Sequence, residues 1–212
     1  MVWKRIHKVL ESEVVGVRQT IVVESVKMIL DEYCAVEIDE IAKLSFIQKM
    51  VLGVCFLQRQ APGVKKFDVL YQTDLSSFFL ACIGKYKKVI EAENDVLINE
   101  KCISEIEKNI PDTESYGELE GSLAQNAMIA LYYMALFITE MDDGNLYFSL
   151  DKLLDSIDIK NQDATIVEDD ILIFNNERII LSELLLDIKS IDCSNNEQIG
   201  VIFKKLDKYL LI

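Results

Sequence analysis

Apolar residues recur every three or four positions along most of the chain, which is the spacing of one face of an α-helix. At the start, Trp3, Ile6, Leu10 and Val14 keep this rhythm, and we expect a helix over residues 3–33 despite several β-branched residues there. Ser45 is followed three residues later by Gln48, a capping-box pattern that opens an apolar helix. The sequence Ala61-Pro62-Gly63 predicts the end of that helix.

The middle of the chain predicts four more helices. Asp74 can cap one over residues 75–91, and Asn94 or Asp95 can cap another that ends before Pro111. Ser115 and Glu118 form a second capping-box pattern. It opens the clearest element, a central helix rich in small and apolar residues that Asp142-Asp143-Gly144 closes. A short helix over residues 146–157 follows.

The last fifth of the chain changes character. The apolar runs 171–174 and 178–181 flank Asn175-Asn176-Glu177, which predicts two short strands around a turn, although residues 179–188 could instead form one helix. A third capping-box pattern at Ser194 and Glu197 predicts a final helix. The expected fold is mainly α: a bundle of about seven to eight helices with a possible small β-hairpin near residues 171–181. We expect residues 1–165 to form a helical domain and residues 166–212 a hairpin-plus-helix extension packed on it.

Composition supports this fold class and adds an uneven charge. The 212 residues are 50% hydrophobic and include only 2 Pro and 8 Gly, which disfavours disorder and turn-rich β folds. The formal net charge is −14, and residues 91–170 hold 20 acidic against 4 basic side chains. Such a surface repels phosphates, so direct nucleic-acid binding is disfavoured and a basic protein partner is favoured. Acidity that only keeps the protein soluble is the plain alternative.

Other features of the sequence predict a cytoplasmic protein. Apolar runs are too short to span a bilayer, and Glu11 and Glu13 interrupt the start where a signal peptide would be apolar, so we expect no membrane association. The five cysteines lack a paired spacing, which argues against a zinc site or a disulfide framework. Cys55 and Cys82 lie in apolar runs and are expected in the core.

Motifs for catalysis are weak. His7 is the single histidine and has no partner pattern for nucleophilic catalysis, and no glycine-rich phosphate loop is present. Gly144 suggests a calcium loop only superficially, since Thr139, Met141 and Leu150 would then stand at ligand positions. The sequence therefore predicts no enzyme activity, no metal site and no cofactor.

Acidic residues at the two ends of the central helix are the remaining candidate site. They could pair with lysine and arginine on a partner, with Tyr116 as an apolar anchor, although Tyr116 could equally be an ordinary half-buried aromatic. Some of the carboxylates at the helix start also suit the helix dipole, whereas those at its end do not. The predicted partner-binding residues are Asp112, Glu114, Tyr116, Glu118, Glu120, Glu140, Asp142 and Asp143.

Two stretches resemble the YjaG-type family of uncharacterised bacterial helical proteins over residues 40–160. The first is Leu44-Ser-Phe-Ile-Gln48 with Gly53, Arg59, Pro62 and Phe67, and the second is Ile110-Pro-Asp-Thr-Glu114 with Ser122, Ala124, Ala127, Ala130 and Tyr132-Tyr133. A tryptophan that this family often carries near residues 75–88 is absent, since the single Trp is Trp3. The resemblance implies an all-helical core and no established activity.

The function expected from these observations is inhibition by protein binding. The most concrete form is an immunity protein, for example one of a contact-dependent or polymorphic toxin system, that neutralises a basic toxin domain such as a nuclease. A carboxylate-rich metal-dependent helical enzyme is one alternative. A structural or regulatory homo-oligomer is another, and the sequence leaves the oligomeric state open.

Overall fold

A computed structural model describes residues 28–92, 98–162, 170–193 and 195–210. Within these ranges every regular element is a helix, so the mainly α prediction is confirmed. The nine α-helices of these ranges exceed the seven or eight expected. They are α2 (Ile29–Tyr33), α3 (Ala35–Ala42), α4 (Phe46–Tyr71), α5 (Leu75–Ala92), α6 (Glu100–Lys108), α7 (Leu119–Glu140), α8 (Asp143–Gln162), α9 (Asp170–Ser190) and α10 (Asn196–Lys205), followed by the 3₁₀ helix η2 (Leu206–Tyr209).

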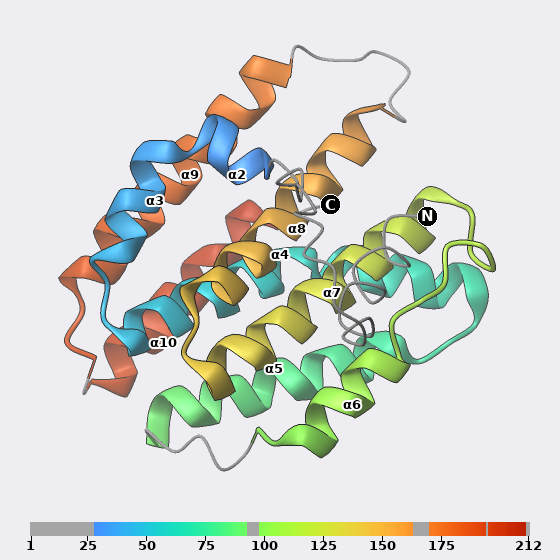
Figure 1. Cartoon of the computed structure of the whole chain (residues 1–212), viewed down its shortest axis with the longest axis horizontal. Helices are drawn as coiled ribbons and strands as arrows, with labels where there is room; N and C mark the ends of the chain where they lie inside the picture. The colour runs from blue at the N-terminus through green and yellow to red at the C-terminus, as the bar shows by residue number, and fades with distance from the viewer. Residues whose placement is uncertain (1–27, 93–97, 163–169, 194, 211–212) are drawn as a thin grey trace, which may run out of the picture.

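The two long helices α4 and α7 form the centre of the bundle (Figure 1). α7 packs on α8, α4 and α6, while α4 also packs on α5, α9 and η2. The short pair α2 and α3 lies over α8 and α9. One continuous apolar core runs through these helices, and α9 and α10 contribute to it with residues such as Phe174, Leu184 and Ile202.

Small residues allow the central helices to approach closely. Ala124, Ala127 and Ala130 of α7 are fully buried. At Gly53 of α4, an added Cβ would lie 2.4 Å from the Sδ atom of Met134 in α7. Such a separation is far below van der Waals contact, so any larger residue at this position would require the Met134 side chain to move.

The first capping box is confirmed. Ser45 accepts a hydrogen bond from the backbone N of Gln48, and the Gln48 side chain accepts one from the backbone N of Ser45. The predicted stop at Ala61-Pro62-Gly63 is wrong, because α4 continues to Tyr71 with Pro62 inside it. Proline costs a helix about 3 kcal/mol. Val64 and Phe67 are almost completely buried, and their burial favours continuation of the helix.

The predicted β-hairpin near residues 171–181 is also wrong, because these residues belong to α9. Glu177, which we placed in the turn, points inward and pairs with the buried Arg59 of α4, with Nη1 and Oε2 2.8 Å apart. Arg59 Nε also donates to the carbonyl of Tyr209, so one guanidinium joins α4, α9 and η2. The rival prediction of a helix over residues 179–188 was the better one.

Several helix starts differ from the expected ones. Asp68, and not Asp74, accepts hydrogen bonds from the first backbone N–H groups of α5, at Leu75 and Ser76. Glu118 stands at the N-cap of α7, so the predicted box with Ser115 does not form. The predicted caps Asn94, Asp95 and Ser194, and the helix over residues 3–27, lie outside the described residues. Asn99 caps α6 and Asn195 caps α10 through their side-chain oxygens.

Candidate functional site

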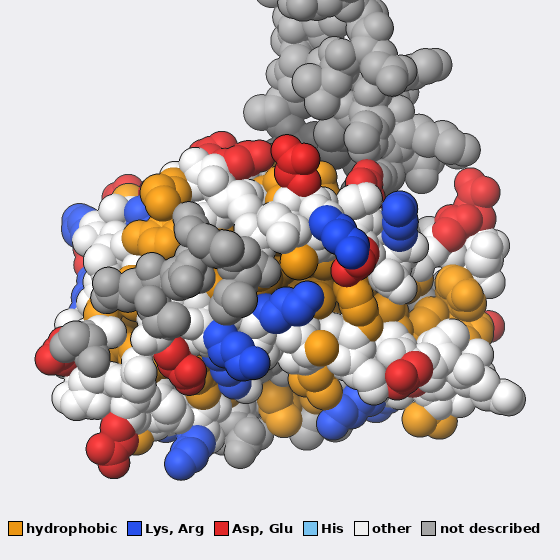
Figure 2. Space-filling model, turned by 90° about the horizontal axis from the view of Figure 1, so that it is seen from below, with side chains coloured by type: hydrophobic (Ala, Val, Ile, Leu, Met, Phe, Trp, Pro, Cys, Tyr) orange, Lys and Arg blue, Asp and Glu red, His pale blue; other side chains and the backbone are white. Residues whose placement is uncertain are grey.

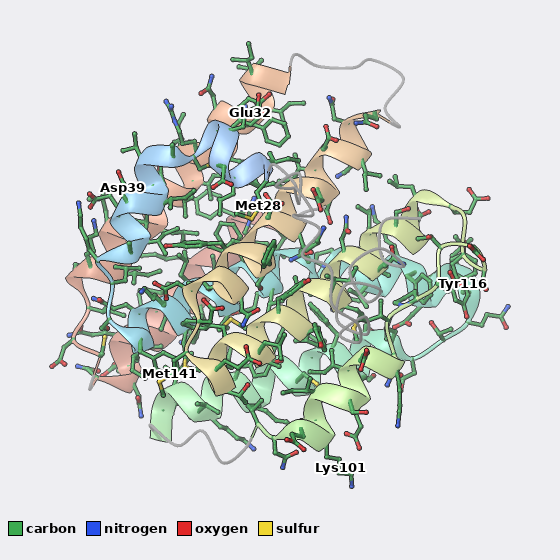
Figure 3. All side chains as sticks on the ribbon, in the orientation of Figure 1. Met28, Glu32, Asp39, Lys101, Tyr116 and Met141 are labelled. Atoms are coloured by element: carbon green, nitrogen blue, oxygen red, sulfur yellow. The ribbon has the colours of Figure 1, made fainter. Side chains whose placement is uncertain are left out.

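The two groups of predicted partner-binding residues lie at opposite ends of α7 (Figure 3, in which Tyr116 and Met141 label the two ends). A helix of 22 residues is about 33 Å long at 1.5 Å per residue. The structure therefore does not bring Glu140, Asp142 and Asp143 together with the residues around Tyr116.

The carboxylates at the C-terminal end of α7 are engaged within the protein. Asp142 Oδ1 accepts a hydrogen bond from the backbone N of Gly144 at 2.9 Å, which caps α8. Asp143 pairs with the nearly buried Lys49, with Nζ and Oδ2 2.6 Å apart. Glu140 accepts a hydrogen bond from Asn145 Nδ2 at 2.9 Å. These acidic residues suit the N-terminus of α8 electrostatically, which explains their tolerance at the end of α7.

The carboxylates at the N-terminal end of α7 have fewer internal contacts. Asp112 Oδ1 accepts a hydrogen bond from the backbone N of Glu114 at 3.0 Å and thereby shapes the turn before α7. Among the described residues, Asp112, Glu114, Glu118 and Glu120 form no ion pair. Asp112, Glu114 and Glu118 are exposed to solvent, and Glu120 is half-buried.

Tyr116 has a structural role at this end. Its ring lies 5.0 Å from that of Phe67 and 4.8 Å from that of Tyr71, both edge-on, and the last two rings are 4.9 Å apart. We call these three residues the aromatic cluster. Edge-on aromatic contacts stabilise such a cluster by about 0.5–1.5 kcal/mol per pair beyond burial. The half-buried Tyr116 therefore fixes the loop before α7 on the end of α4.

A groove lies beside the aromatic cluster. It has a volume of about 690 Å³ and is lined by Lys65, Lys66, Val69, Leu70, Glu118 and Glu120, which we call the end groove. Val69 is 83% exposed and Leu70 is 50% exposed, so two apolar side chains face solvent between two lysines and two carboxylates. Exposed apolar residues surrounded by charge are typical of protein-binding surfaces.

A second hollow borders Phe67 and Tyr116 of the cluster. It has a volume of about 480 Å³ and draws its lining from the end of α4, the start of α5, the end of α6 and the loop before α7. Phe67, Phe78 and Tyr116 contribute aromatic surface to it. We call this hollow the aromatic pocket.

Asp68 holds the α4–α5 connection beside the aromatic pocket. Burial alone would raise the pKa of its carboxyl, but hydrogen bonds outweigh this effect and lower the pKa below its ordinary value. The donors are the backbone N–H groups of Leu75 and Ser76, at 2.7 and 2.8 Å, and the Thr73 hydroxyl at 2.6 Å. The ionised Asp68 therefore positions the residues with which α5 enters the pocket.

Most of this surface was not predicted from the sequence, because the helix was expected to end at Pro62. Residues 65–71 then had no predicted structure. Val64, Phe67 and Tyr71 follow one another at intervals of three and four, and this spacing indicates that the helix continues with Val69 on the opposite side.

Charge is mixed on the face shown in Figure 2, where basic, acidic and hydrophobic side chains lie among one another. Among the described residues, no group of three or more His, Cys, Asp or Glu side chains is arranged to hold a metal ion. His7 lies outside these residues. Cys55 and Cys82 are buried as predicted, and burial raises the pKa of the Cys82 thiol to about 11.

One described helix, α7, is long and apolar enough by composition to cross a membrane, and most of that stretch is buried inside the bundle.

Comparisons with known proteins identify the class of fold. No family model matches the sequence, and no curated protein matches it significantly. A crystal structure of a DUF416 family protein from Shewanella baltica is similar to this chain with a TM-score of 0.66. The two share 13% sequence identity, and the similar region covers 80% of this chain and 92% of that one. At this identity the similarity shows a shared all-helical fold.

Proposed function

We propose that this chain is an acidic protein-binding inhibitor, and most concretely an immunity protein that neutralises a basic toxin domain such as a nuclease. The proposal rests on the surface at the end of the molecule around the aromatic cluster. There, the exposed Glu118 and the half-buried Glu120, which form no ion pair with any described residue, lie beside the exposed Val69 and Leu70.

The chemistry of this surface favours a cationic protein partner. Asp112, Glu114 and Glu118 can form charge-assisted hydrogen bonds with lysine and arginine, while Val69 and Leu70 can bury apolar area. A nuclease needs a cationic surface to bind phosphates, and such a surface complements this one. The net charge of −14 would accelerate the encounter at low salt. We place no partner contact at Glu140, Asp142 or Asp143, because these side chains have internal roles.

Cross-linking at the end groove tests the proposal directly. Lys65 and Lys66 line the groove, so an amine-reactive cross-linker on the purified chain captures proteins that dock there, and mass spectrometry identifies the linked residues. We expect one basic protein whose links map to these two lysines and whose capture weakens at high salt. Its enzymatic activity, measured with and without the chain, should fall when the chain is added.

A charge-neutral variant and a matched control complete the test. Glu114→Gln with Glu118→Gln should reduce capture and flatten its salt dependence, since surface charges act mainly on the association rate. Asp39→Asn with Glu197→Gln removes the same charge from exposed positions on α3 and α10 and should leave capture unchanged. Equal loss in both double variants, or capture without links to Lys65 or Lys66, contradicts the proposed site. The absence of any captured basic protein contradicts the function.

A further inference from the structure

The aromatic pocket combines apolar walls with two carboxylates. Phe67, Phe78 and Tyr116 line it together with Asp74 and Asp112, and Lys108 also contributes to its lining. The residues come from α4, α5, α6 and the loop before α7, and the Asp68 hydrogen bonds and the aromatic cluster hold two of these segments in place. The pocket is therefore built from several elements and does not depend on a single loop.

Each carboxylate in the pocket has an oxygen available for a ligand. Asp112 Oδ1 accepts from the backbone N of Glu114, and Asp74 Oδ1 accepts from the hydroxyl of Ser77 at 2.5 Å. Their Oδ2 atoms accept no hydrogen bond from a described residue. Local hydrogen bonds thus fix the orientation of both carboxylates while half of their acceptor capacity stays open.

We propose that the aromatic pocket binds an arginine side chain of the protein partner. The inference rests on the proposed function and names the chemistry of one contact within it. A guanidinium group is planar, carries five N–H donors and is weakly hydrated, so it can lie against aromatic surface while it donates to carboxylates. Asp74 and Asp112 supply the acceptors, and the partly exposed rings of Phe78 and Tyr116 supply the apolar surface.

The charges around the pocket select against other occupants. Two carboxylates against the single ammonium of Lys108 leave a net charge of −1, which disfavours phosphate and carboxylate ligands. A divalent cation needs six or more oxygen ligands, whereas the lining supplies only two carboxylates and places the ammonium of Lys108 beside them. Lysine carries a compact, strongly hydrated charge, and its removal from water against aromatic surface costs more than that of arginine.

Removal of the Lys108 charge is predicted to change cation binding in the opposite direction from removal of a carboxylate. It is exposed at the last turn of α6, where its charge suits the helix dipole, and it repels a bound guanidinium. Lys108→Gln should therefore strengthen binding of a cation in the pocket, whereas Asp112→Asn and Asp74→Asn should weaken it. Loss of general stability cannot produce both directions of change.

The experiment compares two probes of equal shape and different charge. N-acetyl-arginine amide and N-acetyl-citrulline amide are titrated separately into the full chain, and the backbone amide signals of residues 109–116 are followed by NMR. We expect the arginine probe to bind at least about threefold more tightly, which corresponds to the lower end of a charge-assisted contact. Asp112→Asn should remove that preference, Lys108→Gln should increase it, and Asp39→Asn, on the far side of the molecule from Tyr116 (Figure 3), should leave it unchanged.

The outcomes separate this inference from the proposed function. Equal binding of both probes, no shift in the signals of residues 109–116 up to the solubility limit, or equal weakening by Asp39→Asn overturns the pocket. If cross-linking at Lys65 and Lys66 still captures a basic partner, the function stands without the pocket. If the arginine preference is observed and no partner is captured, the pocket stands and the inhibitor function fails.

Discussion

Asp151 of α8 predicts a pH dependence of stability that is unusual for a carboxylate. Its Oδ1 accepts a hydrogen bond from the backbone N of Leu30 in the first turn of α2, at 2.8 Å. The side chain is only 7% exposed, and burial raises its pKa from 3.8 to about 6 despite that hydrogen bond. Asp155 and Asp31 raise the pKa further, while Lys152 lowers it.

The sign of the effect follows from proton binding. Between about pH 4 and about pH 6 the folded protein holds the Asp151 proton more tightly than the unfolded chain does. The contribution of Asp151 to the free energy of unfolding therefore falls as pH rises through this range and then levels off. A shift of about two pKa units at about 1.4 kcal/mol per unit is worth about 3 kcal/mol.

Asp151→Asn isolates this contribution, because the amide oxygen can still accept from Leu30 and carries no charge. We expect the free energy of unfolding of the variant, relative to that of the wild type, to rise by up to about 3 kcal/mol as pH increases from about 4 to about 7.5. Urea unfolding at both pH values measures the difference. Asp158→Asn, a less buried carboxylate on the same helix, is the control and should leave the wild-type pH profile in place. A stability difference between Asp151→Asn and wild type that does not change with pH would refute the reasoning.

Three further substitutions test the local structure, each by urea unfolding against wild type. Gly121→Ala should destabilise by about 3 kcal/mol, because the added Cβ would lie 1.9 Å from the carbonyl oxygen of Tyr116. The control Gly117→Ala, whose Cβ would meet nothing closer than 3.9 Å, should change stability little, and equal effects of the two substitutions would contradict the close approach. Asp68→Ala should cost about 1–2 kcal/mol and should weaken arginine-probe binding, since α5 loses its cap; an unchanged midpoint would contradict the capping role. Met141→Gly should stabilise by about 0.5–1 kcal/mol because Met141 is exposed at the end of α7 with φ 56°; destabilisation would show that its side chain makes contacts worth more than the backbone strain.

Local sequence signals predicted the helices well where local chemistry decides the structure. The Ser45–Gln48 box formed as expected because both hydrogen bonds lie within one turn. The helix α7 was recognised from its small and apolar residues. Its start was misplaced, because a glutamate three residues after a serine can equally stand at the N-cap itself, as Glu118 does.

Tertiary contacts explain the two larger errors. Pro62 stayed inside α4 because Val64 and Phe67 in the turns after it are buried, and a single-residue stop signal carries no information about burial. In α9, the exposed positions Leu172, Ile179 and Leu186 are as apolar as the buried ones, so the helical rhythm is hidden. The Glu177–Arg59 pair, which holds α9 against α4, joins residues 118 positions apart and leaves no local signal in the sequence.

The same limit explains why the sequence could not divide the acidic residues by role. Asp112 precedes the central helix and Asp142 follows it, and the sequence around them gives no sign of different roles. In the structure, too, each accepts a hydrogen bond from a backbone N two residues on. What differs is their surroundings: Asp142 starts α8 beside the Lys49–Asp143 pair, whereas Asp112 borders a pocket lined by residues of three helices. Binding candidates are therefore the carboxylates that keep acceptor atoms free beside exposed apolar surface, and this property depends on residues brought together only by the fold.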